Sequence, residues 1–132
     1  MADVRILREK RITRFQDQQG LCYYCEQPMW EAHFETKREA LQRFFGDKPA
    51  NAGARSPLQL SGYSKEEKLF IKYRLCTLEH LDRRVNGGGN HHQNLVAACN
   101  HCNSDRQDMP PDQYKQYIRE KLNATEPTKT CD

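Results

Sequence analysis

The chain has 132 residues, a hydrophobic content of 36%, a charged content of 30% and a formal net charge of +3. This length fits one domain, and the low apolar content predicts a thin hydrophobic core that needs additional stabilisation. No apolar run is long enough to span a membrane, and nothing near Met1 resembles a signal peptide. We therefore expect a cytoplasmic protein rather than a secreted or membrane protein. The weak positive charge is compatible with nucleic-acid binding but does not indicate it.

Apolar residues at helical spacing predict a first helix over residues 4–18. Its basic residues, which include Arg11 and Arg14, form either a solvated face or a face that contacts phosphate. A glycine ends this helix, and we expect a tight turn over residues 21–25.

A second helix is predicted over residues 31–45. Its inward-facing residues are Phe34, Leu41, Phe44 and Phe45. A loop with several glycines and prolines follows over residues 46–62. Ser64 has capping-box spacing to Glu67 and should begin a short helical turn. No function is assigned to residues 27–69, which form a helical and loop insertion.

From Leu69 onward, apolar residues alternate with other residues. This pattern predicts a strand between residues 70 and 81 that ends at His80. The glycine-rich sequence over residues 86–90 is typical of a loop between two antiparallel strands.

Asn94 is predicted to cap a helix over residues 95–106, which the prolines near residue 110 then end. A last amphipathic helix is expected over residues 112–122. Its inward-facing residues are Tyr114, Tyr117, Ile118 and Leu122. Residues 123–132 are predicted to form a disordered tail.

Two Cys-x-x-Cys pairs stand out among the six cysteines: Cys22 with Cys25, and Cys99 with Cys102. Four thiolates suffice to close a tetrahedral zinc site. In a reducing compartment this spacing favours metal binding over disulfides. The alternative is a set of reduced thiols that are buried as small hydrophobic groups. Because the pairs lie far apart in the chain, a shared zinc ion would clasp distant segments and contribute to folding.

The residues between the pairs suggest hydrolytic chemistry. Hydrolysis of a phosphodiester needs a base for water and a cation that holds developing negative charge. His80 can accept a proton near neutral pH, while Glu79 and Asn103 offer oxygen ligands for magnesium or manganese. Asn103 directly follows Cys102, so the zinc site would fix its position. Neighbouring residues of a regular strand point to opposite faces, so Glu79 and His80 converge only if the strand ends or bulges there.

The chain resembles the HNH endonuclease family in its zinc-stapled form. The resemblance rests on Cys22-x-x-Cys25, Leu78-Glu79-His80, Gly87-Gly88, Asn94-Leu95 and Cys99-x-x-Cys102-Asn103. It is close over residues 76–106 and loose around Cys22, and the proline that often follows the family's first histidine is absent. The resemblance implies an α+β domain with a small ββα-metal core, a four-cysteine structural zinc site and flanking helices.

The same resemblance implies a role for each matching residue. His80 would be the general base, Glu79 and Asn103 would bind the catalytic magnesium or manganese ion, and Asn94 would brace the loop that orients His80. Separately, the position of the basic residues leads us to expect phosphate contacts from Arg83, Arg84, Arg106, Arg11 and Arg14. For Arg83 and Arg84 the alternative is a solvent-exposed surface pair.

We therefore expect a single nuclease domain over residues 1–122, with its core at about residues 70–106. The implied activity is phosphodiester hydrolysis, with DNA favoured over RNA. Two alternatives remain: a zinc-stapled nucleic-acid-binding module that does not cleave, and a structural zinc protein that acts through protein contacts. No stretch of the sequence indicates an interface for oligomers.

Overall fold

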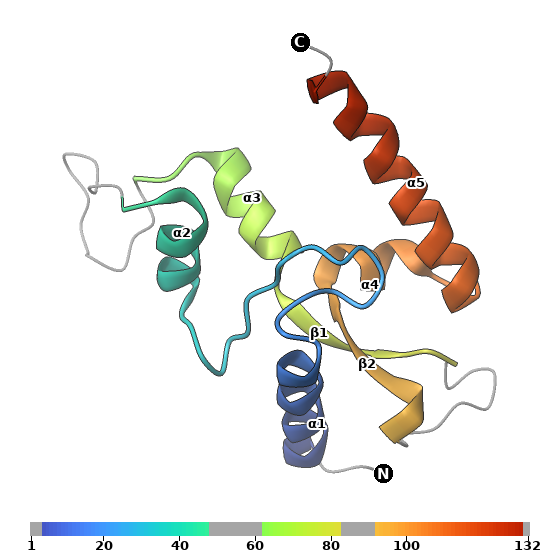
Figure 1. The fold of residues 1–132 in the computed structure, drawn as a ribbon. Coiled ribbons are helices and arrows are strands. Elements are labelled where there is room, and N and C mark those ends of the chain that lie inside the picture. Colours follow the sequence, from blue (N-terminus) through green and yellow to red (C-terminus); the bar gives the residue numbers. More distant parts are fainter. Residues whose placement is uncertain (1–3, 48–61, 83–91, 131–132) are drawn as a thin grey trace.

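The structure is a computed structural model, and it describes residues 4–47, 62–82 and 92–130. In chain order its elements are α1 (Val4–Asp17), α2 (Lys37–Phe45), α3 (Lys65–Tyr73), β1 (Cys76–His80), η2 (His92–Asn94), β2 (Leu95–Cys99), α4 (Asn100–Arg106) and α5 (Pro111–Thr130). They form a small α+β fold around a two-stranded antiparallel sheet, which confirms the predicted class (Figure 1).

The two strands pair in a register that sets Cys76 opposite Cys99 and His80 opposite Leu95. The predicted strand end at His80 is therefore confirmed. The strand lies within the predicted interval of residues 70–81 but begins only at Cys76, because α3 occupies the chain up to Tyr73.

A capping box starts α3, in agreement with the spacing of Ser64 and Glu67. The hydroxyl of Ser64 accepts a hydrogen bond from the backbone N–H of Glu67 at 3.0 Å, and the Glu67 carboxylate accepts one from the N–H of Ser64 at 2.8 Å. The helix then buries Ile71 in a cluster with Trp30 and Leu41. The alternating apolar residues in this stretch therefore belong to a helix, and the apolar side of this helix packs against the Trp30 cluster.

Strand β2 replaces the first half of the predicted helix over residues 95–106, and that part of the prediction is wrong. All five side chains of β2 are buried. Such a fully apolar run lacks the polar positions that distinguish a strand from a helix in sequence. Helix α4 is capped instead by Cys99, whose sulfur accepts a hydrogen bond from the N–H of Cys102. Asn94 therefore lies outside the helix.

Helix α2 begins at Lys37, later than the predicted start at residue 31. Thr36 caps it, because its hydroxyl accepts a hydrogen bond from the N–H of Glu39 at 3.1 Å. The chain before this cap forms a turn around the buried carboxylate of Glu31.

The burial of α2 follows the prediction at three of four positions. Leu41 is fully buried, and Phe44 and Phe45 pack against the same cluster. Phe34 lies in the turn before the helix and is 47% exposed, so its predicted burial is wrong. Helices α2 and α3 pack on each other. In Figure 1, α4 lies between this pair of helices and α5.

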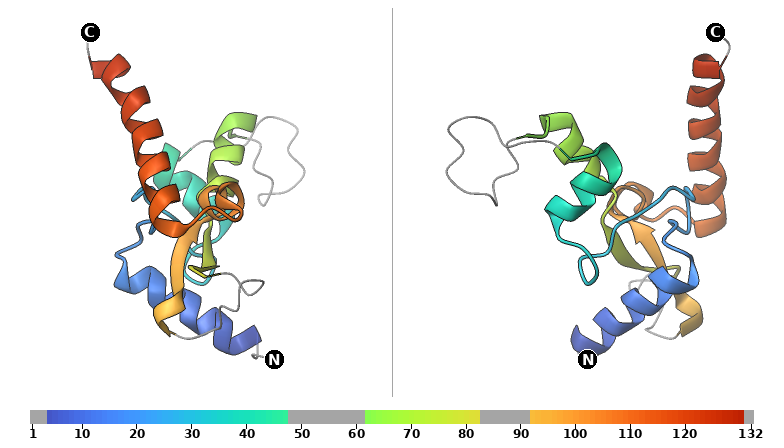
Figure 2. Two further views of the ribbon diagram at one scale, coloured as in Figure 1. Left: turned by 90° about the vertical axis from the view of Figure 1, so that its right-hand side faces the viewer. Right: turned by 60° about the vertical axis from the view of Figure 1, so that its left-hand side comes forward.

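Helix α5 projects from the body of the molecule (Figure 2). Tyr114 and Ile118 are buried as predicted, whereas Tyr117 is 42% exposed, which corrects its predicted inward position. The helix continues past residue 122 to Thr130, so the predicted disordered tail is wrong for the backbone of residues 123–130. In the part of the chain that the structure describes, no helix has the length and apolar character to cross a membrane.

Helix α1 matches its predicted range except for the last residue, and it packs against both strands. Just after it, the side-chain amide of Gln18 accepts a hydrogen bond from the N–H of Ala97 at 2.9 Å and donates one to the Ala97 carbonyl at 2.8 Å. The end of α1 is therefore fixed to the middle of β2.

Candidate metal centre and active site

The two Cys-x-x-Cys pairs meet in space, as the sequence predicts. The sulfurs of Cys22, Cys25, Cys99 and Cys102 all lie within 4.8 Å of one another, and all four residues are buried. The sulfurs of Cys25 and Cys99 are 4.0 Å apart, far longer than a disulfide of about 2 Å. Tetrahedral zinc with thiolate ligands sets its sulfurs about 3.8 Å apart, so this group can bind a metal ion such as zinc.

Backbone hydrogen bonds hold the turns that carry the four cysteines in place. The turn that carries Cys22 is closed by a hydrogen bond from the N–H of Glu26 to the Cys22 carbonyl at 3.0 Å, with Glu26 in the left-handed region at φ 58°. Backbone N–H groups point at two sulfurs, from Cys99 to Cys22 at 3.3 Å and from Cys102 to Cys99 at 3.5 Å. The N–H of Tyr23 donates to the Ala97 carbonyl, which holds the turn against β2.

The environment also favours ionised sulfur at the first pair. Hydrogen bonding with Cys102 lowers the pKa of Cys22 to about 7 and holds the pKa of Cys25 well below its usual range. The guanidinium of Arg74 lies 3.7 Å from the Cys25 sulfur. Hydrogen bonds with Cys22 and Cys25 in turn hold the pKa of Cys102 above its usual range, so the thiols share their protons, and metal binding would release these protons.

A buried ion pair fixes the end of β1 to α4. The carboxylate of Glu79 lies 3.3 Å from Nε of Arg106, and it accepts a hydrogen bond from the hydroxyl of Tyr24 at 3.4 Å. Arg106 also donates to the carbonyls of His80 and Leu81, each at 3.1 Å. This single guanidinium therefore holds three successive residues of the strand end. Its burial corrects the expectation that Arg106 contacts phosphate.

Glu79 and His80 do not share a face of the sheet. The pairing of β1 with β2 stays regular through His80, so the bulge that would bring both side chains together is absent from β1. His80 is opposite Leu95, whose side chain lines a hollow with residues of α1. Glu79 points to the other face, toward Arg106 on α4. His80 is half-buried and is the last residue of the strand.

Asn103 lies on the same face as Glu79. Its side-chain amide donates to the hydroxyl of Thr77 at 2.9 Å and to the carbonyl of Leu78 at 3.4 Å. Thr77 and Glu79 are two residues apart on one strand, so their side chains point the same way. The structure thus places Glu79 and Asn103 on one side of β1, with His80 on the other.

Asn94 closes the base of the loop that follows β1. Its side chain accepts a hydrogen bond from the N–H of Asp82 at 2.7 Å and donates one to the Asp82 carbonyl at 3.0 Å. The N–H of Leu81 donates to the Asn94 carbonyl at 2.8 Å. A hollow of about 360 Å³ borders these residues and Arg106. Asn94 therefore holds the chain immediately after His80, although it caps no helix.

The other arginines predicted to contact phosphate are Arg11, Arg14, Arg83 and Arg84. Arg11 forms a two-pronged ion pair with Glu31, whose side chain is fully buried, so this arginine has a structural partner instead of the expected phosphate. Arg14 lies 3.5 Å from Asp17 on the same helix and lines the hollow beside Leu95. Arg83 and Arg84 lie outside the described residues.

Two contact residues were not predicted from the sequence: Tyr24, which contacts Glu79, and Arg74, which contacts Cys25 of the candidate metal centre. Both contacts join residues far apart in the chain, at 55 and 49 positions. Neither has a sequence signal, except that Tyr24 stands between the cysteines of the first pair.

Comparison of the chain with protein-family models, with curated protein sequences and with solved structures finds no match. The assignment of function therefore depends on the motifs and on the geometry of these residues.

Proposed function

We propose that the protein is a metal-dependent endonuclease of the HNH type that hydrolyses phosphodiester bonds, with DNA as its substrate. The observation that carries the proposal is the position of Asn103. It follows Cys102 of the metal centre and packs against β1 on the face that bears Glu79. The order of β1, a long connection, β2 and α4 is the order that a ββα-metal core requires.

In this proposal His80 accepts the proton of the attacking water, because a neutral imidazole can act as a base near neutral pH. Oxygen atoms of Glu79 and Asn103 would hold a magnesium or manganese ion, which would stabilise negative charge on the phosphate when bound. Strand pairing ends at His80, so the water would lie beyond the end of β1. For this, the imidazole of His80 would have to turn past the strand end toward the oxygen ligands, which lie on the other face of β1.

Basic residues of α1 beside Leu95, the cross-strand partner of His80, support a phosphate-containing substrate. Leu95, the cross-strand partner of His80, borders a hollow that Lys10, Thr13 and Arg14 of α1 also line. Glu9 is the acidic residue in that lining. Such contacts to phosphate position a nucleic acid without reading its sequence.

The test is cleavage of plasmid DNA by zinc-loaded protein, with magnesium or manganese added. His80→Ala should abolish cleavage while leaving the far-UV circular dichroism unchanged. His33→Ala is the matched control, since His33 is an exposed histidine whose ring packs on Phe34. Cleavage by His80→Ala at the parental rate would refute the assigned base, and absence of cleavage by the parent would refute the enzyme.

One observation favours a second function, a nucleic-acid-binding module that does not cleave. The carboxylate of Glu79 already has a cationic partner in Arg106 and a hydrogen bond from Tyr24. A module of this kind would bind DNA with an affinity that falls steeply as salt rises, with no cleavage in any metal. A purely structural zinc protein would show no such salt-dependent binding.

A further inference from the structure

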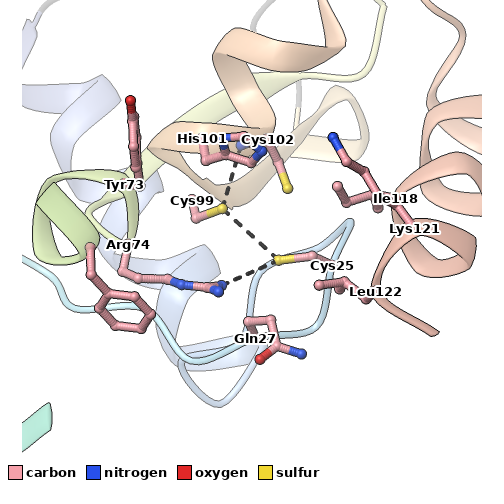
Figure 3. Close-up of a pocket in the computed structure, with 11 residues that line it drawn as sticks. Cys25, Gln27, Tyr73, Arg74, Cys99, His101, Cys102, Ile118, Lys121 and Leu122 are labelled. Atoms are coloured by element: carbon pink, nitrogen blue, oxygen red, sulfur yellow. Dashed lines mark hydrogen bonds between the residues drawn. The ribbon is translucent and has the colours of Figure 1, made fainter. Parts of the chain in front are cut away.

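A pocket between α3, α4 and α5 reaches the metal centre. Its volume is about 260 Å³, and its lining includes Cys25, Cys99 and Cys102. Arg74 extends from the end of α3 into this space, and its guanidinium points at the Cys25 sulfur (Figure 3). The metal centre is therefore approached by solvent on the side where Arg74 lies.

The position of Arg74 is fixed from several directions. It caps the end of α3, where its N–H donates to the Phe70 carbonyl at 3.0 Å. Its carbonyl accepts a hydrogen bond from the N–H of Trp30 at 3.1 Å. Its guanidinium lies 5.0 Å from the centre of the Phe70 ring. These contacts hold the charged group in place over Cys25 and link it to the cluster around Trp30.

The metal centre needs such a charge. Four thiolates around a divalent ion carry a net charge of −2, and the thiolate-bearing residues are buried, where an uncompensated charge is unfavourable. Backbone N–H groups compensate part of this charge at Cys22 and Cys99. At Cys25 the backbone of Gln27 contributes, and the charged side chain of Arg74 is a further donor at 3.7 Å. Lys121 and His101 also line the pocket, and none of the described residues in its lining is acidic.

We propose that Arg74 is a positioning residue of the metal centre. It holds the Cys25 thiolate in its ligating position, compensates its charge and slows release of the metal ion through the pocket. The inference rests on metal binding by the four cysteines, and it does not depend on nuclease activity. Residues that hydrogen-bond to metal ligands typically change metal affinity by about 10–100-fold when they are removed.

The experiment measures release of zinc from the purified protein to a chromogenic chelator in excess. Arg74→Gln removes the charge and should release zinc about 10–100-fold faster than the parent. Arg43→Gln is the matched control, because Arg43 likewise lies over a phenylalanine ring, that of Phe44 at 4.6 Å, and bonds an acidic group. It should release zinc at the parental rate.

Arg74→Lys tests whether a positive charge alone is sufficient or whether the planar shape of the guanidinium is also needed. It retains the positive charge but loses the planar group that stacks on Phe70 and reaches the sulfur, so its release rate should be intermediate. The fluorescence of Trp30, the one tryptophan of the chain, reports whether each variant is folded. If Arg74→Gln does not fold, a folded Arg74→Lys that releases zinc faster than the parent supports the proposal.

Release at the parental rate from every folded Arg74 variant would overturn the role of Arg74, as would equal acceleration in Arg43→Gln. A parent protein that binds no zinc would instead refute the metal centre itself. Cobalt substitution makes this distinction, because tetrathiolate cobalt has characteristic absorption bands. Loss of those bands in Arg74→Gln at a cobalt concentration that saturates the parent would also support the proposal.

Discussion

Nε of Arg106 lies 3.3 Å from the carboxylate of Glu79, and both side chains are almost completely buried. The pair joins the end of β1 to the last residue of α4, and the two terminal nitrogens of Arg106 bond the carbonyls of His80 and Leu81. A buried charge whose partner is removed is strongly unfavourable. The position of the strand end therefore depends on this arginine.

Arg106→Met should lower the free energy of unfolding by about 3–5 kcal/mol, because Glu79 would stay buried without its partner. Urea unfolding followed by circular dichroism at fixed zinc concentration measures the change. Arg43→Met is the control, since its ion pair with Glu35 is partly exposed and should contribute at most about 1 kcal/mol.

The double variant Glu79→Gln with Arg106→Met should be destabilised by less than the sum of the two single variants, because it leaves no unpaired buried charge. Additive effects would show that the two side chains do not interact. In that case the ion pair would not be what fixes the end of β1.

Removal of the metal should unfold the cluster that surrounds the cysteines. Its large apolar members are few, mainly Tyr24, Met29, Tyr114 and Ile118, so ligation has to supply part of the folding free energy. We expect a chelator to lower the melting temperature of the parent strongly. Cys102→Ser should melt at the temperature of the chelated parent, whether or not zinc is added. Equal melting curves for the parent with and without chelator would refute a structural metal.

The cysteine pairs illustrate what sequence alone can predict. Their spacing indicates a shared metal site, and the structure brings all four sulfurs together. The capping box at Ser64 is local, and it too is confirmed. By contrast, the run from Leu95 to Cys99 is apolar throughout, and only its pairing with β1 makes it a strand.

The sequence also did not predict the ion-pair partners of two arginines, because each partner is distant in the chain. Arg11 and Arg106 belong to polar patterns that suggest exposed cations. Each is instead paired with a carboxylate far away in the chain, Glu31 and Glu79 respectively. The charge of an arginine is visible in the sequence, but the burial of its partner depends on tertiary packing.

We expect ionisation of the buried Cys76 thiol to lower the free energy of unfolding at alkaline pH. Burial, together with the nearby carboxylate of Glu31, raises the pKa of the Cys76 thiol to about 12, from 9.0. The folded chain thus keeps this proton where the unfolded chain loses it. The protonated thiol therefore contributes to the free energy of unfolding fully below pH 9. This contribution, at most about 4 kcal/mol, is lost between about pH 9 and 12.

The measurement compares urea unfolding of the parent and Cys76→Ala from pH 8 to 11, at the same zinc concentration. The variant should lose less stability over this interval than the parent. Other alkaline groups, such as the buried Tyr24, are common to both proteins and cancel in the comparison. A parallel loss of stability in both would show that the Cys76 thiol ionises equally in the folded and unfolded chains.

Asn94 provides a graded test of the loop that follows His80. Asn94→Asp keeps the oxygen that accepts from the N–H of Asp82 but replaces the donor to the Asp82 carbonyl, whereas Asn94→Ala removes both. If this loop orients His80 for nuclease chemistry, cleavage should fall in the order parent, Asn94→Asp, Asn94→Ala. The hydrogen bonds are solvent-exposed, so each should contribute only about 1 kcal/mol to stability. Plasmid cleavage and urea unfolding on the same preparations separate the two effects, and a fall in cleavage that merely follows the fraction of unfolded protein would assign Asn94 to stability alone.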